Sequence, residues 1–396
     1  MPSATPLLRI ALVTETYPPE VNGVAMTIAR LANGLHHLGH EVQLIRPRQK
    51  SVNDVSADGV TDLVTVPGFT LPFYRSLQLG LPASGRLHRL WCDTPPDVVH
   101  IVTEGPLGAS ALRVARRLEL LTVSGFHTNF HTYSSYYRLG FLQRLIIAYL
   151  RHFHNRCQAT LVPTLDTAHT LQNLAFDNIH VLARGVDTQL FSPARRSKAL
   201  RRDWQADDNT PIVLYVGRIA AEKNLSLAIT AFQAIANIRP DARFVLVGDG
   251  PMAAKLRNDH PEFIFCGTRR GIDLAAHYAS ADIFLFPSLT ETFGNVTLEA
   301  MASGLAVIAF DYAAAREHIE HGLSGLLAPL DDAAAFVTAA QNAVQNVDKT
   351  RLMGNRAMQV VQTFDWNRIV DELVRHYLNL NNKTIANRYG LNNGSA

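Results

Sequence analysis

The stretch PIVLYVGRIAAEKNL, residues 211–225, begins with a run of apolar residues and continues through a glycine into a segment with two basic side chains. Apolar runs of the same kind recur along the chain: RIALVT, EVQLI, DVVHIV, LLTVSG and ATLVP before it, and RFVLVG, FIFCG, DIFLFP and LAVIAF after it. Strands that are apolar on both faces are typical of parallel sheets covered by helices. The pattern predicts an α/β protein with doubly wound sheets.

The length of the chain and a break in this pattern predict two domains. The chain has 396 residues, which is more than one hydrophobic core usually supports. The pattern is interrupted at ARGVDTQLFSPARR, residues 183–196. We expect Rossmann-like domains over residues 1–190 and 191–364, and a flexible tail over residues 381–396, which is rich in Asn and Gly. Two such domains facing each other would form a ligand-binding cleft, because doubly wound sheets bind ligands at the carboxyl ends of their strands.

The composition excludes several other classes of protein. A net charge of +3 does not indicate a nucleic-acid-binding domain. The three cysteines form no CxxC pair, so we expect neither disulfides nor a structural metal site, and we expect a cytoplasmic location. No apolar run reaches the roughly 20 residues of a membrane-spanning helix, and the first residues lack the features of a signal peptide.

Glycine and basic residues follow strands in both halves. Gly23, in TYPPEVNG, permits close backbone approach at the start of a helix, where free amides attract an anion. Arg218 and Lys223 follow the apolar run at residues 212–216, and a guanidinium with an ammonium group suits a diphosphate. Taken singly, these features are also compatible with an ordinary loop and a solvated basic pair.

The segment RFVLVGDGPMAAKL, residues 243–256, imitates a dinucleotide-binding fingerprint through Gly248 and Gly250. A true fingerprint has an acidic residue at the end of the next strand. The next apolar run, FIFCGTRRG, has none. The segment therefore favours a glycine turn beside a nucleotide over a dehydrogenase.

Two acidic residues lie eight positions apart in SLTETFGNVTLEAMASG, residues 288–304. A helix that begins near Gly294 would offer its first amides, those of Asn295 and Val296, to a phosphate. Eight residues of helix rise roughly 12 Å. Glu291 could then bind the hexose, and Glu299 the ribose, of a nucleotide diphosphate sugar whose phosphates lie between them. The alternative, a capping residue and a solvated helix face, is disfavoured by the apolar segment after Glu299.

As a set, these motifs resemble the retaining glycosyltransferases of family 4, which have the GT-B fold of two Rossmann-like domains facing across a cleft. The similar segments are the E-x7-E spacing, GRIAAEKNL, VGDGP and the linker GVDTQLFSP. The resemblance implies that the C-terminal half binds the nucleotide sugar and that a last helix, residues 365–378, packs back on the N-terminal, acceptor-binding domain. The donor-binding residues that it implies are Gly23, Gly217, Gly248, Gly250, Phe293, Gly294, Asn295, Val296 and Glu299.

The resemblance also implies a mechanism. The family's histidine contacts the transferred sugar, and His127 in SGFHTNFHTYSSYYRLGF occupies that position. Arg218, Lys223, Glu291 and His127 are therefore the expected catalytic residues. The protein would mainly supply electrostatic stabilisation while the departing phosphate assists the acceptor hydroxyl. The sequence contains no Asp-x-Asp, in agreement with metal-independent, cofactor-free chemistry.

A resemblance to one branch of this family predicts the donor and the acceptor. The stretch from His127 to the run ATLVP looks like that of GDP-mannose-dependent α-mannosyltransferases and glycolipid synthases. We expect GDP-mannose as donor and a membrane lipid or glycolipid as acceptor, with a UDP-glucose or other UDP-hexose transferase on a soluble or polysaccharide acceptor as the alternative. A UDP-sugar 2-epimerase and a non-catalytic sugar-nucleotide sensor are more remote.

Residues 136–156 mix aromatic and basic side chains in a way that suits an anionic membrane surface. The same pattern fits a core-packed helix with solvated arginines equally well. We expect peripheral association with the inner face of the plasma membrane. The residues predicted to contact the acceptor or the membrane are Asn22, Tyr136, Tyr137, Arg138, Arg144 and Arg151.

Overall fold

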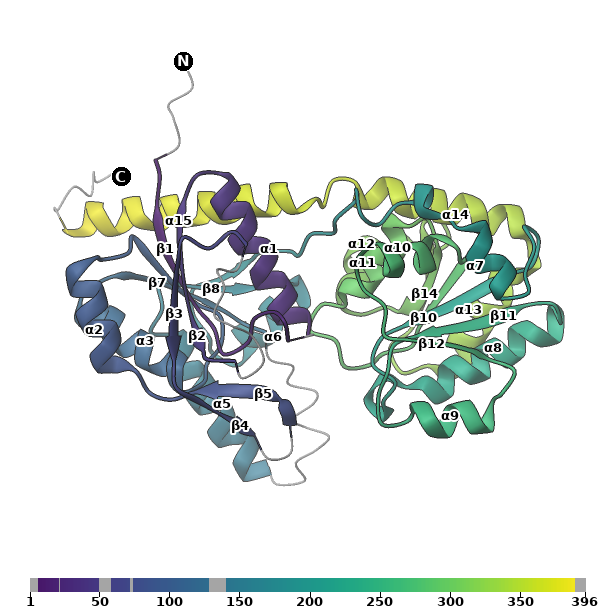
Figure 1. Cartoon of the computed structure of the whole chain (residues 1–396), viewed down its shortest axis with the longest axis horizontal. Coiled ribbons are helices and arrows are strands. Elements are labelled where there is room, and N and C mark those ends of the chain that lie inside the picture. The colour runs from purple at the N-terminus through teal and green to yellow at the C-terminus, as the bar shows by residue number, and fades with distance from the viewer. Residues whose placement is uncertain (1–5, 21, 50–57, 72–73, 128–139, 389–396) are drawn as a thin grey trace, which may run out of the picture. The chain divides into compact units, whose positions relative to one another are not determined.

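The computed structural model describes residues 6–20, 22–49, 58–71, 74–127 and 140–388. The chain divides into two compact units: the first joins Met1–Arg184 to Trp366–Ala396, and the second is Gly185–Asp365 (Figure 1). The sequence analysis placed the change of domain at residue 190, within the same linker. The predicted α/β class with two Rossmann-like domains is confirmed.

A seven-stranded parallel sheet forms the centre of the first unit, in the order β3-β2-β1-β6-β7-β8-β9. The strand order reverses direction between the neighbours β1 and β6, so their loops leave the sheet together at its carboxyl edge. The strands are β1 (Arg9–Val13), β2 (Glu41–Pro47), β3 (Asp62–Val66), β6 (Val98–Ile101), β7 (Leu121–Gly125), β8 (Ala159–Val162) and β9 (Ile179–Val181).

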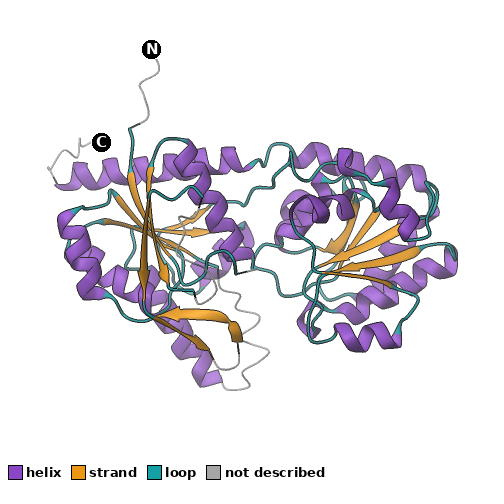
Figure 2. Ribbon diagram, viewed as in Figure 1, coloured by secondary structure: helices purple, strands orange, loops and turns teal. Residues whose placement is uncertain are grey.

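Helices cover both faces of this sheet (Figure 2), and alternate residues of a strand point to opposite faces. Ile10 and Leu12 pack with α1 and α15, whereas Ala11 and Val13 pack with α2, α3 and α5. The helices of the unit are α1 (Gly23–His37), α2 (Ser84–Asp93), α3 (Pro106–Arg117), α5 (Gly140–His154), α6 (Leu165–Asn173) and α15 (Trp366–Arg388).

The second unit has a six-stranded parallel sheet in the order β12-β11-β10-β13-β14-β15. Val213 and Tyr215 pack with α8, α9 and α13 on one face, and Ile212 and Leu214 with α10, α11, α12 and α14 on the other. The strands are β10 (Ile212–Val216), β11 (Arg243–Val247), β12 (Ile264–Gly267), β13 (Ile283–Phe286), β14 (Ala306–Phe310) and β15 (Gly325–Ala328). The helices are η1 (Pro193–Arg195), α7 (Lys198–Asp203), η2 (Ala221–Lys223), α8 (Leu225–Ile238), α9 (Ala253–Asp259), α10 (Gly271–Ala279), α11 (Asn295–Ala302), α12 (Ala313–His318), α13 (Ala333–Gln345) and α14 (Val347–Val361).

Some elements were not expected from the apolar runs. The sequence analysis missed the edge strands β3, β9 and β15, which are short or carry polar residues. It also missed the antiparallel hairpin of β4 (Gly68–Leu71) and β5 (Tyr74–Gly80), which interrupts the βα series of the first unit. Strands β3 and β9 are less fully buried than the central strands, so their sequences lack the continuous apolar signal, whereas β15 is largely buried but only four residues long.

The last helix, α15, belongs to the first unit and packs beside α1 (Figure 1). Ile369, Val370, Leu373 and Tyr377 are buried in the core of that unit. The helix continues to Arg388, so residues 381–388 are its last turns and not part of the predicted flexible tail. The rest of that tail, residues 389–396, lies outside the described residues.

The close packing of α1 against α15 can be tested by mutation. A β-carbon on Gly34 would overlap the side chain of Val370. Gly34→Ala should therefore lower the free energy of unfolding by about 1–3 kcal/mol, the usual cost of overpacking. Glycine-to-alanine in an unobstructed helix instead stabilises by roughly 0.5–1 kcal/mol.

Chemical denaturation of the single variants and of Gly34→Ala combined with Val370→Ala measures the effect. The added alanine should cost less in the Val370→Ala background, where the overlapping methyl groups are gone. Gly85→Ala is the matched control, because no atom lies within 4 Å of its β-carbon position. Equal costs in both backgrounds would contradict the predicted contact.

Candidate functional site

In the second unit, the strand order reverses between β10 and β13, which pair in parallel. The loops after these strands therefore lie at one edge of the sheet, at the position where doubly wound domains bind ligands. The loop after β10 contains Arg218 and ends in η2, and the loop after β13 leads into α11. The topology thus brings together two segments that the sequence analysis singled out separately.

Lys223 and Glu291 form an ion pair at this edge, from Nζ to Oε1. Their side chains are 21% and 16% exposed, respectively, so the pair is largely withdrawn from solvent. Two neighbours hold the glutamate: Ser288 donates from its hydroxyl to Oε1 at 2.7 Å, and the Tyr312 hydroxyl donates to the Glu291 carbonyl at 2.8 Å. The sequence analysis did not identify Ser288 or Tyr312, which carry no charge or motif.

Arg218 lies in the same loop but is held less firmly. Its guanidinium donates from Nη1 to Oε1 of Glu222 at 2.9 Å, and its side chain is 55% exposed. An exposed ion pair of this kind stabilises the fold by at most about 1 kcal/mol. A ligand with stronger acceptors could therefore take over the guanidinium at small cost.

Glu299 lies inside α11 and has a partner in the protein. The hydroxyl of the wholly buried Tyr278 donates to Oε2 of Glu299 at 2.9 Å. Gly294 precedes the helix with φ of 93°, a left-handed conformation that favours glycine, and no side chain caps the helix start. The amides of Asn295 and Val296 thus open the helix, and the buried ring of Phe293 lies beside them.

Two glycines of the β11 loop, Gly248 and Gly250, have a structural role. A β-carbon on Gly248 would overlap the Gly217 carbonyl, and one on Gly250 the Ile219 carbonyl. The Ile219 amide donates to the Asp249 carbonyl at 3.0 Å across the same contact. These glycines let the two loops pack backbone to backbone. Their predicted donor-binding role stays a prediction.

In the first unit, Asn22 caps helix α1. Its Oδ1 accepts from the Ala25 amide at 2.8 Å, and its Nδ2 donates to the Thr16 hydroxyl at 2.7 Å. Gly23 is the first residue of the helix, as the sequence predicted. The amide side chain thus organises the loop, and its predicted acceptor contact stays a prediction.

A buried acid that the sequence analysis missed lies in the loop after β1. Glu15 accepts hydrogen bonds from the Gly80 amide and, at 3.0 Å, from the Leu107 amide at the start of α3. Burial raises the pKa of its carboxyl above the usual range, against the lowering effect of these amides. The residue joins the loops at the β1–β6 reversal, and nothing in TETYPP distinguishes it from a surface glutamate.

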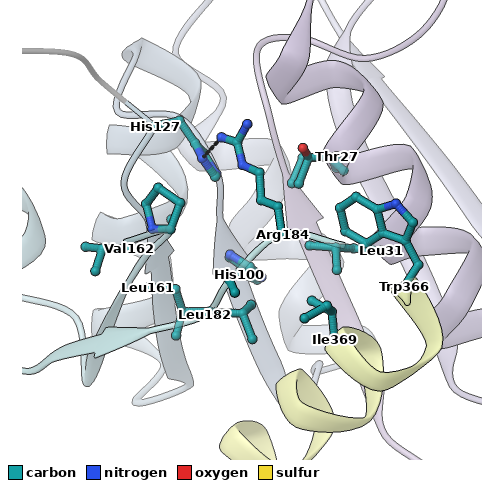
Figure 3. Close-up of a pocket in the computed structure, with 14 residues that line it drawn as sticks. Thr27, Leu31, His100, His127, Leu161, Val162, Leu182, Arg184, Trp366 and Ile369 are labelled. Carbon is teal, nitrogen blue, oxygen red and sulfur yellow. Dashed lines mark hydrogen bonds between the residues drawn. The ribbon is translucent and has the colours of Figure 1, made fainter. Parts of the chain in front are cut away.

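His127 lies at the end of β7 and lines a pocket of the first unit (Figure 3). Nη2 of Arg184 lies 3.3 Å from Nδ1 of the histidine. His100, from β6, lines the same pocket, and its Nδ1 lies 2.6 Å from the Tyr377 hydroxyl of α15. Thr27 from α1 and Trp366 from α15 complete the polar and aromatic part of the wall. Sequence reasoning found His127 but neither Arg184 nor His100.

Arg144 and Arg151 lie exposed on α5. Leu145 and Tyr149 are also exposed, while Leu150, on the opposite side of the helix, is buried. Helix α5 therefore packs through one face and presents a mixed basic and apolar face to solvent. The predicted Tyr136, Tyr137 and Arg138 lie outside the described residues.

The described part of the chain contains neither a helix that could span a membrane nor a cluster of metal-ligating side chains. Within it, no helix is long and apolar enough to cross a membrane. No group of three or more His, Cys, Asp or Glu side chains among these residues could hold a metal ion. The cysteines Cys92, Cys157 and Cys266 are free thiols.

Comparison with known proteins gives matches over both units. Residues 21–190 match the family model described as Glycosyltransferase Family 4, and residues 210–346 match that of Glycosyl transferases group 1. A GDP-mannose-dependent alpha-mannosyltransferase of Mycolicibacterium smegmatis is 36% identical over 375 residues, which is 93% of this chain and 97% of the relative. An alpha-monoglucosyldiacylglycerol synthase of Acholeplasma laidlawii is 28% identical over 76% of this chain and 80% of its own.

Among solved structures, sucrose-phosphate synthase from Thermosynechococcus elongatus aligns with a TM-score of 0.77 over 94% of this chain and 99% of its own. The two sequences are 19% identical, so this likeness shows the fold alone.

Proposed function

This chain belongs to glycosyltransferase family 4, and on that premise we propose that it transfers mannose from GDP-mannose to a membrane lipid or glycolipid with retention of the α configuration. The observation that carries the proposal is the 36% identity to a GDP-mannose-dependent alpha-mannosyltransferase over nearly the full length of both chains. The relative that makes a glucosyl diacylglycerol supports a lipid as the acceptor.

The diphosphate of the donor would bind at the β10–β13 edge. An ammonium group has three N–H donors, of which Lys223 gives one to Glu291. The others, together with the accessible guanidinium of Arg218 and the start of α11, would face the phosphate oxygens. Positive charge fixed there stabilises the negative charge that develops on the leaving diphosphate. In the proposed mechanism these groups act without a metal ion or cofactor.

The two carboxylates would hold the sugar ends of the donor. In the proposal, Glu291 accepts from hydroxyls of the hexose and Glu299 from those of the ribose. Support comes from their fixed orientations, since Ser288 and Lys223 hold the first and Tyr278 holds the second. Carboxylates that are positioned before the donor binds lose less conformational entropy on binding.

A donor screen tests the function. The purified protein is incubated with radiolabelled GDP-mannose or UDP-glucose, with and without a membrane lipid extract, in buffer with and without EDTA. We expect an organic-phase product from GDP-mannose that needs the extract, contains an α-linked mannose and forms at the same rate with EDTA. A changed sugar without acceptor would identify an epimerase, binding without turnover a sensor, and a glucosylated product the UDP-hexose alternative. A β-linked product would contradict retention.

Replacement of the paired residues tests the site. Lys223→Ala and Glu291→Ala should each lower kcat by about 10²–10³-fold, the usual effect of removing one group that stabilises transition-state charge. Steady-state rates with GDP-mannose measure the loss, and circular dichroism checks that the variants are folded. The exposed Lys349 and Glu262 provide the matched alanine controls, which should keep the wild-type rate. Near-wild-type turnover in both site variants would contradict the roles assigned to Lys223 and Glu291.

We further propose that the exposed face of α5 binds an anionic membrane surface, through the arginines Arg144 and Arg151 and the apolar side chains of Leu145 and Tyr149. Arginines near such a surface contribute roughly 1 kcal/mol each. The protein should float with anionic vesicles at low ionic strength, and salt should release it.

Charge reversal locates the membrane contact. Arg144→Glu with Arg151→Glu should abolish flotation. The matched control is Arg368→Glu with Arg375→Glu, which reverses two exposed arginines on α15 and should leave flotation intact. Sedimentation of the wild-type protein without the vesicles at low salt would refute the membrane contact while leaving the donor chemistry untouched.

A further inference from the structure

We propose that Arg184 is the positioning residue of His127, and that it holds the imidazole in the tautomer with the proton on Nε2. The catalytic consequence of this inference rests on the proposed function. The structural claim stands independently of it, because it concerns the state of a side chain in the protein without substrate.

The chemistry of the two groups determines the tautomer. A guanidinium group has N–H donors and no acceptor. Nη2 of Arg184 lies 3.3 Å from Nδ1 of His127, so Nδ1 must provide the lone pair. In a neutral imidazole the proton is then on Nε2. A doubly protonated ring would place one N–H against another, and the pair would repel.

Arg184 has little freedom to leave this position. The residue is 6% exposed and lines the pocket together with His127. The other end of its guanidinium lies near the start of α1, with Nη1 3.7 Å from the β-carbon position of Gly23. Figure 3 shows the guanidinium reaching from the Arg184 backbone toward the histidine ring. The Arg184 side chain thus links the segment after β9 to His127.

Nε2 of His127 lies beside a residue of the pocket wall. A β-carbon on Gly125 would lie 2.7 Å from Nε2 of His127 and 3.4 Å from Nε2 of His100, so both nitrogens lie close to that glycine, which lines the pocket. His100 is 2% exposed, and its Nε2 has no hydrogen-bond partner among the described residues. In the proposed tautomer, the Nε2–H of His127 is a donor in this part of the pocket wall.

The surroundings keep the histidine neutral. Burial lowers the pKa of His127 well below its ordinary value, and the positive charge of Arg184 lowers it further. Among the described residues, His100, on β6, and His154, on α5, also lower its pKa through their charge. Burial lowers the pKa of His100 to about 4. This environment therefore keeps His127 neutral, with its N–H donor in one orientation, across the physiological pH range.

Nitrogen NMR on protein labelled with ¹⁵N-histidine tests the tautomer directly. The His127 signals are assigned by their loss in a His127→Gln variant. In the wild-type protein without substrate, we expect a proton on Nε2, an unprotonated Nδ1, and no titration between about pH 6 and pH 8, since the ordinary histidine pKa near 6.5 is lowered. A proton on Nδ1 would overturn the proposal, and this measurement needs no variant of Arg184.

Variants of Arg184 test the cause. Arg184→Met removes the donor at similar length, so His127 should populate both tautomers and titrate at higher pH than in the wild type. Arg184→Lys keeps a donor and should restore the Nε2–H form at least in part. Arg46→Met is the matched control, because Arg46 is a buried arginine of the same unit that does not line the pocket. The His127 signals of the Arg46→Met protein should match those of the wild type.

The kinetic consequence is a loss in kcat with GDP-mannose that exceeds the change in KM. Outer groups that fix the tautomer of a functional histidine are worth about 10–100-fold in metal sites, and we expect a loss of that order in Arg184→Met, with partial recovery in Arg184→Lys. Unchanged His127 signals in a folded Arg184→Met protein would overturn the proposal. Absence of mannosyl transfer by the wild type would refute the proposed function and leave the tautomer result intact.

Discussion

The arrangement of the second unit depends on one constraint, the reversal of strand order between β10 and β13. In a parallel sheet every strand-to-helix loop leaves at the same edge, but successive helices usually cross to the same face and close the space between neighbouring loops. At the reversal, the helices after the two strands go to opposite faces: α8 packs in one core cluster and α11 in the other. Lys223 and Glu291 meet because their loops border that point.

The same reversal occurs between β1 and β6 of the first unit, with a different outcome. There the carboxylate of Glu15 receives backbone amides from Gly80 and Leu107 and is 3% exposed. A buried carboxylate with such partners stabilises the loops that donate to it. In the second unit the acid at the reversal is Glu291, which follows the other strand of the pair, β13; it bonds to a lysine and a serine, and its side chain is 16% exposed. Backbone amides of the protein therefore occupy the acid at the β1–β6 reversal. At the β10–β13 reversal, the cationic side chains of Lys223 and Arg218 remain near the surface.

Two hydrogen-bonded pairs at the pocket of the first unit, Arg184–His127 and Tyr377–His100, join four separate segments. His127 follows β7, His100 lies in β6, Arg184 follows β9, and Tyr377 lies in α15, the last helix of the chain. The Tyr377–His100 hydrogen bond is fully buried, so the return of α15 to this unit contributes to the wall of the pocket as well as to the core. The hydrogen bond a histidine makes through one ring nitrogen sets its tautomer, and the contact from Arg184 Nη2 to Nδ1 of His127 is such a bond.

The sequence by itself determined the fold class and the strongest candidate residues at the β10–β13 edge. Each of the ten apolar runs correctly predicted one strand, because central parallel strands are buried on both faces and so lack polar residues. Arg218 and Lys223 were identified because a guanidinium and an ammonium group after a strand suit a diphosphate, and Glu291 and Glu299 because their spacing matches the two sugar ends of a nucleotide diphosphate sugar. Only the tertiary structure decided which of them pair, that Gly248 and Gly250 serve loop packing, and that Arg184, His100, Tyr278 and Glu15 belong to the polar interior. These last residues are far apart in sequence or stand in ordinary surroundings, and a contact between distant segments leaves no periodicity or spacing in a single chain.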